Sequence, residues 1–247
     1  MTIRPRPEPF APSNLPAFTS SGLGITSWSP LDNGGHSFVL KITTSPSFTS
    51  TTPTTSVLKI FRFYLAPHGD SPTATASTGP YHYYNLESAA YSRLKHSRLT
   101  GTTVPEIYGV IHITPEHEHH LAVSQGMKSL AGMRRHFREL TVVGLWMEYV
   151  PGARLLPRDA GRWAEELRTG LTRIHAAGVV QGDINWRNLI VGEGEGSERG
   201  VAWVDFSTAR VRGEGEGEGE WEERLDSEKG RLEGLLARAG RRRGRGC

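Results

Sequence analysis

Residues 181–191 read QGDINWRNLIV and residues 204–207 read VDFS, and these two stretches decide how the chain is interpreted. The run 189–191 predicts a strand, the segment GEGEGSERG predicts a turn, and residues 201–204 predict the returning strand. Such a hairpin would bring Asp205 beside Asn188, where a carboxylate and an amide oxygen suit one hard cation. The alternative is an ordinary hairpin in which Asp and Asn serve as turn residues.

A helix is predicted immediately upstream of this hairpin. Asp159 suits the N-cap position and Gly178 suits the C-terminal stop. Between them an apolar stripe recurs at helical spacing, formed by Trp163, Leu167, Leu171 and Ile174. The helix is therefore expected to be buried and to lead the chain into the loop that contains Asp183.

The string IHAAGVVQGD, with Asn188 and the Asp-Phe pair at 205–206, resembles the catalytic loop and metal-binding segment of the protein-kinase-like fold. Within this fold, the string resembles the fungal kinase-like and the aminoglycoside or choline phosphotransferase branch. It covers roughly residues 22–210 and implies an α+β, bilobal fold with an antiparallel-sheet N-lobe and a reduced, mainly helical C-lobe. It also implies that Asp183 positions or deprotonates an acceptor hydroxyl, while Asn188 and Asp205 hold Mg²⁺.

Residues 57–63, VLKIFRF, match the strand whose lysine meets the phosphates of ATP in this family. Lys59 is the expected phosphate-binding residue, and Val57 lies on the same strand face and is expected against the adenine. Lys41 is the competing choice because residues 39–42 repeat the tetrapeptide VLKI. Strand order favours Lys59, since three strands are expected before the helix that follows.

That helix is predicted from about Pro80 to His96. Glu87 shares one face with Ala90, Tyr91 and Leu94. The resemblance implies that Glu87 orients Lys59, whereas an exposed helical Glu is the plain alternative.

The sequence Asp32-Asn33-Gly34-Gly35 predicts a hairpin, in which Gly34 and Gly35 either cradle phosphates or simply form the turn.

Residues 145–152, LWMEYVPG, resemble the segment that joins the two lobes of a kinase. By this resemblance Met147 is the gatekeeper, the backbone of Glu148 and Val150 binds the adenine edge, and Ile190 completes the nucleotide-binding set. A core strand that ends in a turn is equally compatible with this segment. ATP and Mg²⁺ are the expected ligands.

The domain organisation expected from these motifs has five parts. They are a flexible N-terminal segment (1–21), an N-lobe with hinge strand (22–150), a reduced C-lobe (151–212), an acidic Gly-Glu linker (213–220), and a C-terminal helix with a basic tail (221–247).

Composition narrows the class of protein. The chain has 247 residues, is 36% hydrophobic and carries a net charge of +3. No apolar run approaches the ~20 residues of a membrane span, and no secretory signal is visible. The only cysteine is Cys247, so no internal disulfide framework is expected. We expect an intracellular monomer, cytoplasmic or nuclear.

Two charged segments have alternative interpretations. The tail RRRGRGC either makes weak contact with nucleic acid or an acidic membrane surface, or is a solubilising terminus. The histidines of residues 115–120, PEHEHH, are numerous enough for a metal, but no second cluster accompanies them.

Three residues depart from the family pattern: Gln181 replaces a His, Gly182 replaces an Arg, and Ser207 replaces a Gly. After Ala209 there is no Ala-Pro-Glu, and the lower helical lobe is expected to be nearly absent. Two functions therefore remain open. One is an ATP-dependent phosphotransferase acting on a hydroxyl of a protein Ser or Thr or of a small molecule. The other is a catalytically weak or inactive pseudokinase that binds nucleotide or acts as a scaffold.

Overall fold

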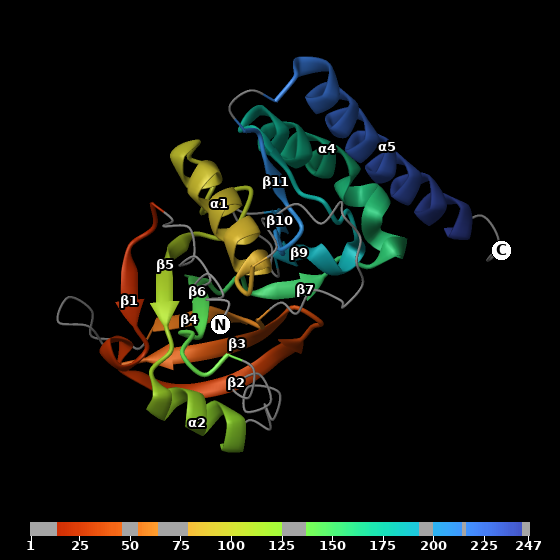
Figure 1. The fold of residues 1–247 in the computed structure, drawn as a ribbon. Helices are drawn as coiled ribbons and strands as arrows, with labels where there is room; N and C mark the ends of the chain where they lie inside the picture. Colours follow the sequence, from red (N-terminus) through yellow and green to blue (C-terminus); the bar gives the residue numbers. More distant parts are fainter. Residues whose placement is uncertain are drawn as a thin grey trace. The chain divides into compact units, whose positions relative to one another are not determined.

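The computed structural model describes residues 14–45, 54–63, 79–124, 137–192, 200–213 and 216–243 (Figure 1). The chain divides into two compact units. The first comprises Met1–Ser88 and Tyr108–Tyr149, and the second comprises Ala89–Ile107 and Val150–Cys247. The described residues form four α-helices and a mixed six-stranded sheet with two smaller sheets. The predicted α+β class is therefore confirmed.

The six-stranded sheet has the order β1-β5-β6-β4-β3-β2. Its strands are β1 (Ala17–Thr19), β2 (Ile25–Asn33), β3 (Ser37–Thr44), β4 (Thr54–Phe61), β5 (Ile107–His112) and β6 (Val143–Glu148). The pairs β2–β3, β3–β4 and β4–β6 are antiparallel, which confirms the hairpin predicted at Asp32–Gly35.

Strand β1 corrects two expectations. It pairs in parallel with β5, so the sheet is mixed rather than antiparallel throughout. It also lies inside residues 1–21, which the sequence analysis expected to be flexible. Gly109 explains how this short strand can approach: a Cβ at Gly109 would lie only 2.4 Å from the carbonyl oxygen of Pro16.

The two faces of this sheet carry different helices. Trp28 is paired with Ile42, and its ring lies 5.3 Å from that of His117 in α2 (Pro115–Ser124). The first half of α1 (His82–His96) meets the opposite face through Glu87 and Lys59. The His-rich stretch is therefore part of a helix, and within the described residues no group of three or more His, Cys, Asp or Glu side chains could hold a metal.

The second unit contains α4 (Ala160–Ala176), α5 (Glu218–Arg243) and short strands. Strands β10 (Val201–Trp203), β9 (Leu189–Gly192) and β7 (Gly152–Arg154) form one sheet in that order, and β11 (Arg210–Val211) pairs with β8 (Val179–Val180). Single 3₁₀ turns lie at Ser21–Leu23, Pro157–Asp159 and Trp186–Asn188.

Helix α4 matches the predicted helix. Leu167, Leu171 and Ile174 are buried, and Gly178 has a φ of 74° just after the helix end, a conformation that glycine adopts readily. Asp159 occupies the N-cap position, but its side chain makes no capping hydrogen bond. The position of the helix start was therefore predicted correctly and the capping contact was not.

Helix α5 begins earlier and ends later than expected. The sequence predicted a helix near Trp221–Ala237 after an acidic linker at 213–220, whereas α5 starts at Glu218, inside that segment. Glu218 and Glu220 in the first turn favour this start, because carboxylates stabilise the positive end of a helix dipole. Among the described residues, no helix has the length and apolarity needed to cross a membrane.

Candidate functional site

The first group of candidate residues lies in unit 1, on β4 and α1. The Lys59 ammonium lies 2.5 Å from Glu87 Oε2, and the two side chains are 6% and 1% exposed. This confirms the predicted contact and excludes the alternative in which Glu87 is an exposed helical residue. A buried ion pair of this kind is stable only as a pair, because either charge alone would be desolvated without compensation.

Register places the other nucleotide candidates of this unit near Lys59. Val57 is the cross-strand partner of Met147, and Lys59 is the partner of Leu145. Since alternate residues share a face, all four side chains lie on the same side of the sheet. Glu148 is partnered with Ser56 on the opposite side, so only its backbone could serve as predicted.

Lys41 lies on this same sheet face, as the partner of Val57. Our expectation that strand order alone separates the two lysines was therefore incomplete. The two lysines differ in the group that each contacts. The Lys41 ammonium lies 4.3 Å from the ring centroid of Tyr149, whereas the Lys59 ammonium pairs with the Glu87 carboxylate.

Gly34 and Gly35 form the turn between β2 and β3. Neither has a positive φ, and a Cβ at Gly35 would meet no atom within 4 Å. Neighbouring contacts hold the turn instead: Arg62 Nη2 donates to Asn33 Oδ1 at 2.6 Å, and His36 stacks on Tyr83 at 3.7 Å between centroids. The turn itself does not require glycine, and the two predicted roles remain open.

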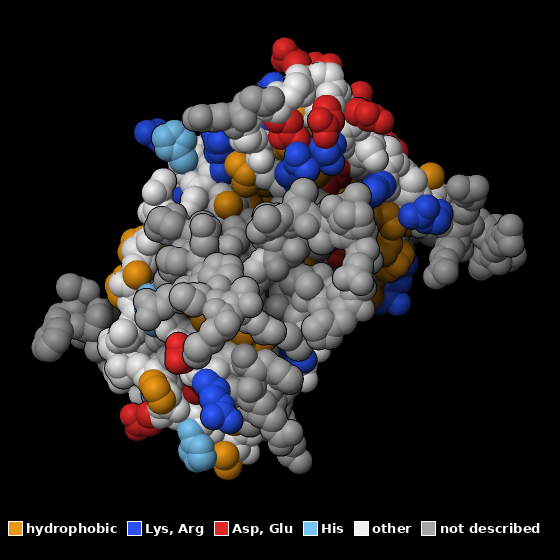
Figure 2. Space-filling model, viewed as in Figure 1, with side chains coloured by type: hydrophobic (Ala, Val, Ile, Leu, Met, Phe, Trp, Pro, Cys, Tyr) orange, Lys and Arg blue, Asp and Glu red, His pale blue; other side chains and the backbone are white. Residues whose placement is uncertain are grey.

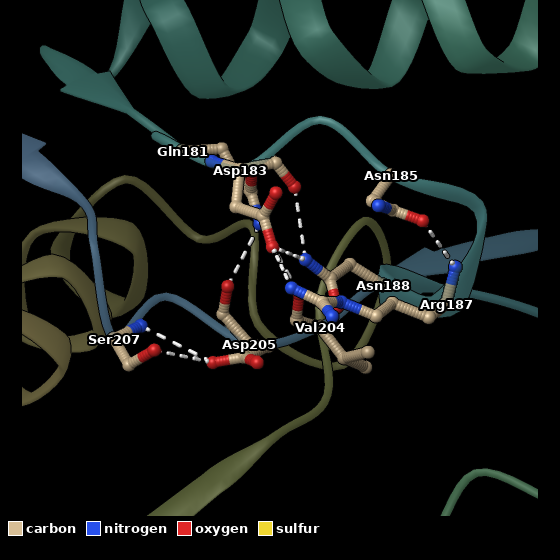
Figure 3. Close-up of polar contacts among 8 residues, drawn as sticks. All are labelled: Gln181, Asp183, Asn185, Arg187, Asn188, Val204, Asp205 and Ser207. Atoms are coloured by element: carbon tan, nitrogen blue, oxygen red, sulfur yellow. Dashed lines mark hydrogen bonds and ion pairs between the residues drawn. The ribbon is translucent and has the colours of Figure 1, made fainter. Parts of the chain in front are cut away.

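The second group lies in unit 2, around the loop that carries Asp183 (Figure 3). Asn188 Nδ2 donates to the Asp183 carbonyl at 2.9 Å and to its Oδ2 at 3.1 Å. Arg187, which the sequence analysis did not single out, donates to the same Oδ2 at 2.7 Å. Its position four residues after Asp183 is the signal that could have identified it. Asp183 is thus held by its own loop.

Gln181 braces this loop from a fully buried position. Its Oε1 accepts from the Asp183 amide at 2.7 Å, and its Nε2 donates to the Asp205 carbonyl at 2.7 Å (Figure 3). One side chain therefore fixes the backbone at both carboxylates. The amide group supplies one acceptor atom and one donor atom, as a neutral imidazole does, and its Nε2 also donates to the Val204 carbonyl at 3.4 Å.

Gly182 is required by geometry. It has a φ of 90°, and a Cβ there would lie 2.2 Å from the carbonyl oxygen of Thr208. No side chain fits at this position without a shift of the Thr208 backbone.

Asp205 adopts a left-handed conformation with a φ of 63°. For a non-glycine residue this backbone conformation is strained by about 1–2 kcal/mol, and such strain concentrates at functional sites. Ser207 contacts this carboxylate: its hydroxyl donates to Asp205 Oδ1 at 2.8 Å. Phe206 between them is buried against the ring of Tyr91.

The predicted hairpin is confirmed by the pairing of β9 with β10, and its turn at 193–199 lies outside the described residues. The Val204 amide donates to the Asn188 carbonyl at 2.9 Å, which places Asp205 one residue from this contact. Figure 3 shows the Asn188 side chain turned toward Asp183 and the Asp205 carboxylate turned toward Ser207. Ile190 is half-buried on β9, and Val150 is buried at the start of unit 2.

Glu228 on α5 is a site residue that the sequence analysis missed. It is 2% exposed and accepts from the amides of Gln181 and Gly182 at 3.1 and 2.7 Å. A signal for it exists in the sequence: Glu228 falls on the helix face of Trp221 and Leu232, seven residues after one and four before the other. A carboxylate within an apolar stripe needs buried donors.

No protein-family model matches the chain, and no curated protein matches it.

Proposed function

We propose that this chain is an ATP-dependent phosphotransferase with a protein-kinase-like, bilobal fold. It would transfer the γ-phosphoryl group of MgATP to a hydroxyl of an acceptor, yielding ADP and a phosphate ester. Unit 1 would correspond to the N-lobe, and unit 2 to a reduced C-lobe completed by α5.

The observation that carries this proposal is the frame around Gln181. Two carboxylate residues, Asp183 and Asp205, are fixed by one buried amide side chain, and Asp205 is held in a strained conformation. A plain hairpin requires neither the strain nor the shared brace. A site for metal-bound phosphates requires both carboxylates in fixed positions.

The donor set fits Mg²⁺. A carboxylate from Asp205 and the amide oxygen of Asn188 are hard oxygen ligands, and the amide nitrogen of Asn188 is already engaged by Asp183. When bound, Mg²⁺ would neutralise charge on the phosphate oxygens. Asp205 and Asn188 would hold the cation.

The remaining residues have distinct roles in the proposal. Lys59, held by Glu87, would bind phosphate oxygens, and Val57 and Met147 would contact the adenine. Asp183 would orient the acceptor hydroxyl and receive its proton as the oxygen–phosphorus bond forms. The acceptor is a hydroxyl of a small molecule or of a protein Ser or Thr.

A second function, a nucleotide-binding pseudokinase, is favoured by one specific contact. The Asp183 carboxylate is engaged by both Arg187 and Asn188, at 2.7 and 3.1 Å. A carboxylate held in this way is less available to an acceptor hydroxyl. Nucleotide binding would be the same in both functions, and only turnover separates them.

A thermal-shift titration with ATP, with and without Mg²⁺, tests the proposal. Ligand at about 100 times its Kd should raise Tm by roughly 5–10 °C for a chain of this size. The absence of any Mg²⁺-dependent shift at millimolar ATP would refute both functions. ATP consumption with peptide, sugar, aminoglycoside and choline acceptors then follows, and binding without turnover would select the pseudokinase.

A further inference from the structure

Arg187 is an exposed cation that lies directly against the proposed base. Its Nη2 donates to Asp183 Oδ2 at 2.7 Å, and the two side chains are 61% and 35% exposed. Asn185 helps to place it, because the Asn185 side chain accepts from the Arg187 amide at 3.3 Å and caps the turn Trp186–Asn188. Figure 3 shows the Arg187 guanidinium turned back toward Asp183. The loop therefore holds a positive charge beside its carboxylate.

The fold of the loop does not depend on this ion pair. The Asp183 backbone is already held by the Gln181 side chain at 2.7 Å and by Asn188 at 2.9 Å. An ion pair between exposed side chains contributes little to stability, because water and salt screen both charges. Another anion can therefore replace the Asp183 carboxylate at Arg187 at little cost to the fold.

The charge of Arg187 separates acceptors by their own charge. Asp183 and Arg187 are the only charged side chains in residues 179–191. A guanidinium group binds a carboxylate or a phosphate through paired N–H donors, and it repels an ammonium group. A hydroxyl compound with an anionic group is therefore favoured beside Asp183, whereas a positively charged acceptor such as an aminoglycoside or choline is disfavoured.

A cavity of about 500 Å³ adjoins this loop at Gly182, and its lining is balanced in charge. Three arginines and three glutamates line it, so the cavity by itself favours neither sign. Arg210, one of these arginines, lies 2.9 Å from a Glu216 oxygen. Figure 2 shows acidic side chains gathered where α5 begins, with Lys and Arg side chains next to them. Arg210 is thus a matched control for Arg187, as an exposed arginine of the same unit in an ion pair.

We propose that Arg187 determines acceptor specificity and that the acceptor carries a carboxylate or a phosphate close to its reacting hydroxyl. This inference rests on the proposed function and names the acceptor class for it. The anionic group of the acceptor would take the guanidinium, which releases Asp183 Oδ2 from one of its two donors. The hydroxyl proton then passes to Asp183 as the acceptor oxygen bonds to the γ-phosphorus. The bond between that phosphorus and the leaving oxygen of ADP breaks in the same step.

The experiment compares three polyols that differ at one carbon: sorbitol is neutral, gluconate is an anion and glucamine is a cation. Steady-state kinetics with MgATP are measured for the unaltered chain, Arg187→Gln, Arg187→Lys and Arg210→Gln. In the unaltered chain, kcat/KM for gluconate should exceed that for sorbitol roughly tenfold to a hundredfold, the scale of a hydrogen bond between charged groups. Glucamine should be the poorest acceptor of the three.

The variants should separate specificity from structure. Arg187→Gln should bring the kcat/KM values for gluconate and sorbitol to within about twofold of each other, because neither acceptor then meets a charge. The same variant should raise the turnover number for sorbitol, since Asp183 is no longer paired, and a general loss of structure cannot produce that gain. Arg187→Lys should keep part of the preference, and Arg210→Gln should keep all of it.

A pair of serine peptides identifies the source of the anion. If a peptide with Glu beside the serine is used and its Gln counterpart is not, while gluconate is turned over no faster than sorbitol, the anionic acceptor is a protein. If gluconate is used and both peptides are ignored, it is a small molecule. Either result supports an anionic acceptor, and preference for the Gln peptide together with sorbitol would contradict it.

Equal kcat/KM values within both acceptor sets, or a preference for glucamine, would overturn the inference. So would an anion preference that survives in Arg187→Gln or disappears in Arg210→Gln. If the unaltered chain shows no turnover with any acceptor, the proposed phosphotransfer fails, and NMR titration of gluconate and glucamine tests the recognition by itself. Gluconate binding that is lost in Arg187→Gln would support the anion preference, and the absence of gluconate binding would refute it.

Discussion

The two groups of candidate residues are held in opposite ways. In unit 1, Lys59 and Glu87 depend on each other through one buried ion pair between a strand and a helix. In unit 2, Asp183 is held by several hydrogen bonds, from Asn188, Arg187 and the Gln181 brace. A single substitution at Lys59 or Glu87 should therefore destabilise the fold. A single substitution in the second group should lower activity while the fold is retained.

The most damaging substitution should be Lys59→Met. It leaves the Glu87 carboxylate buried without its cation, which is expected to lower the free energy of unfolding by about 3–5 kcal/mol and to remove ATP binding. Chemical denaturation and isothermal titration measure the two effects. Lys41→Met is the matched control, and it should lower stability by no more than about 1 kcal/mol.

The double variant Lys59→Met/Glu87→Gln separates stability from binding. It should be more stable than Lys59→Met alone, since no unpaired charge remains, and it should still bind ATP poorly. Equal ATP affinities in the Lys41 and Lys59 variants would contradict the assignment of Lys59.

The second largest effect should come from Asp205→Asn. Asn tolerates the left-handed conformation, so the variant removes one negative charge with little change in backbone strain. The change replaces the only carboxylate ligand in the proposed Mg²⁺ site with a neutral amide, so Mg²⁺-dependent ATP binding should become undetectable. Titration of MgATP checks this, and an unchanged affinity would remove Asp205 from the site.

Asp183→Asn should affect turnover alone. Its loop is fixed by backbone contacts that remain, so the melting temperature and ATP affinity should be close to those of the unaltered chain. The rate of phosphoryl transfer should fall roughly 10²-fold, as expected for losing a positioned acid–base group. Near-normal turnover in this variant would mean that another base, or a contaminating enzyme, is responsible.

Ser207→Ala should have a smaller effect, and in the opposite direction. Removing the hydroxyl releases the Asp205 carboxylate from one hydrogen bond. Mg²⁺-dependent ATP affinity should then rise roughly threefold to tenfold, the scale of a single hydrogen bond. A loss of affinity would show that Ser207 holds Asp205 in its binding position.

The weakest effect should be at the exposed pair Arg168–Glu233, which joins α4 to α5 at 2.7 Å. The hydrogen bond from Arg168 lowers the pKa of Glu233 below its ordinary value of 4.5. The pair therefore stabilises the fold above that pH, and the contribution is lost as the pH falls through the lowered pKa. Glu233→Gln should lower stability by about 0.2–1 kcal/mol at pH 7 and by less near pH 3, as measured by urea denaturation.

The sequence could predict those elements and contacts whose residues follow a short, local pattern. The Lys59–Glu87 pair was predictable from the family resemblance, because a strand motif and one helix face each supplied a residue for it. The β9–β10 hairpin and α4 were predictable from their local patterns. The catalytic and binding roles of these residues stay predictions.

Two relations that escaped prediction join segments far apart in the chain. Glu228 lies 47 residues from Gln181, and only the packed position of α5 brings them together. Strand β1 has three residues and pairs with β5. Its Ala17 lies 93 positions before its partner Val110 (110 − 17). Neither relation has a local pattern, because each depends on tertiary packing.

Gly182 has a consequence for anyone who wishes to engineer this chain. With 2.2 Å between a would-be Cβ and the Thr208 carbonyl, any library that randomises residue 182 should return only glycine among folded clones. A phosphate-binding side chain would have to be introduced elsewhere. Arg210 and Ser227 line the adjoining cavity and offer starting points whose side chains already have room.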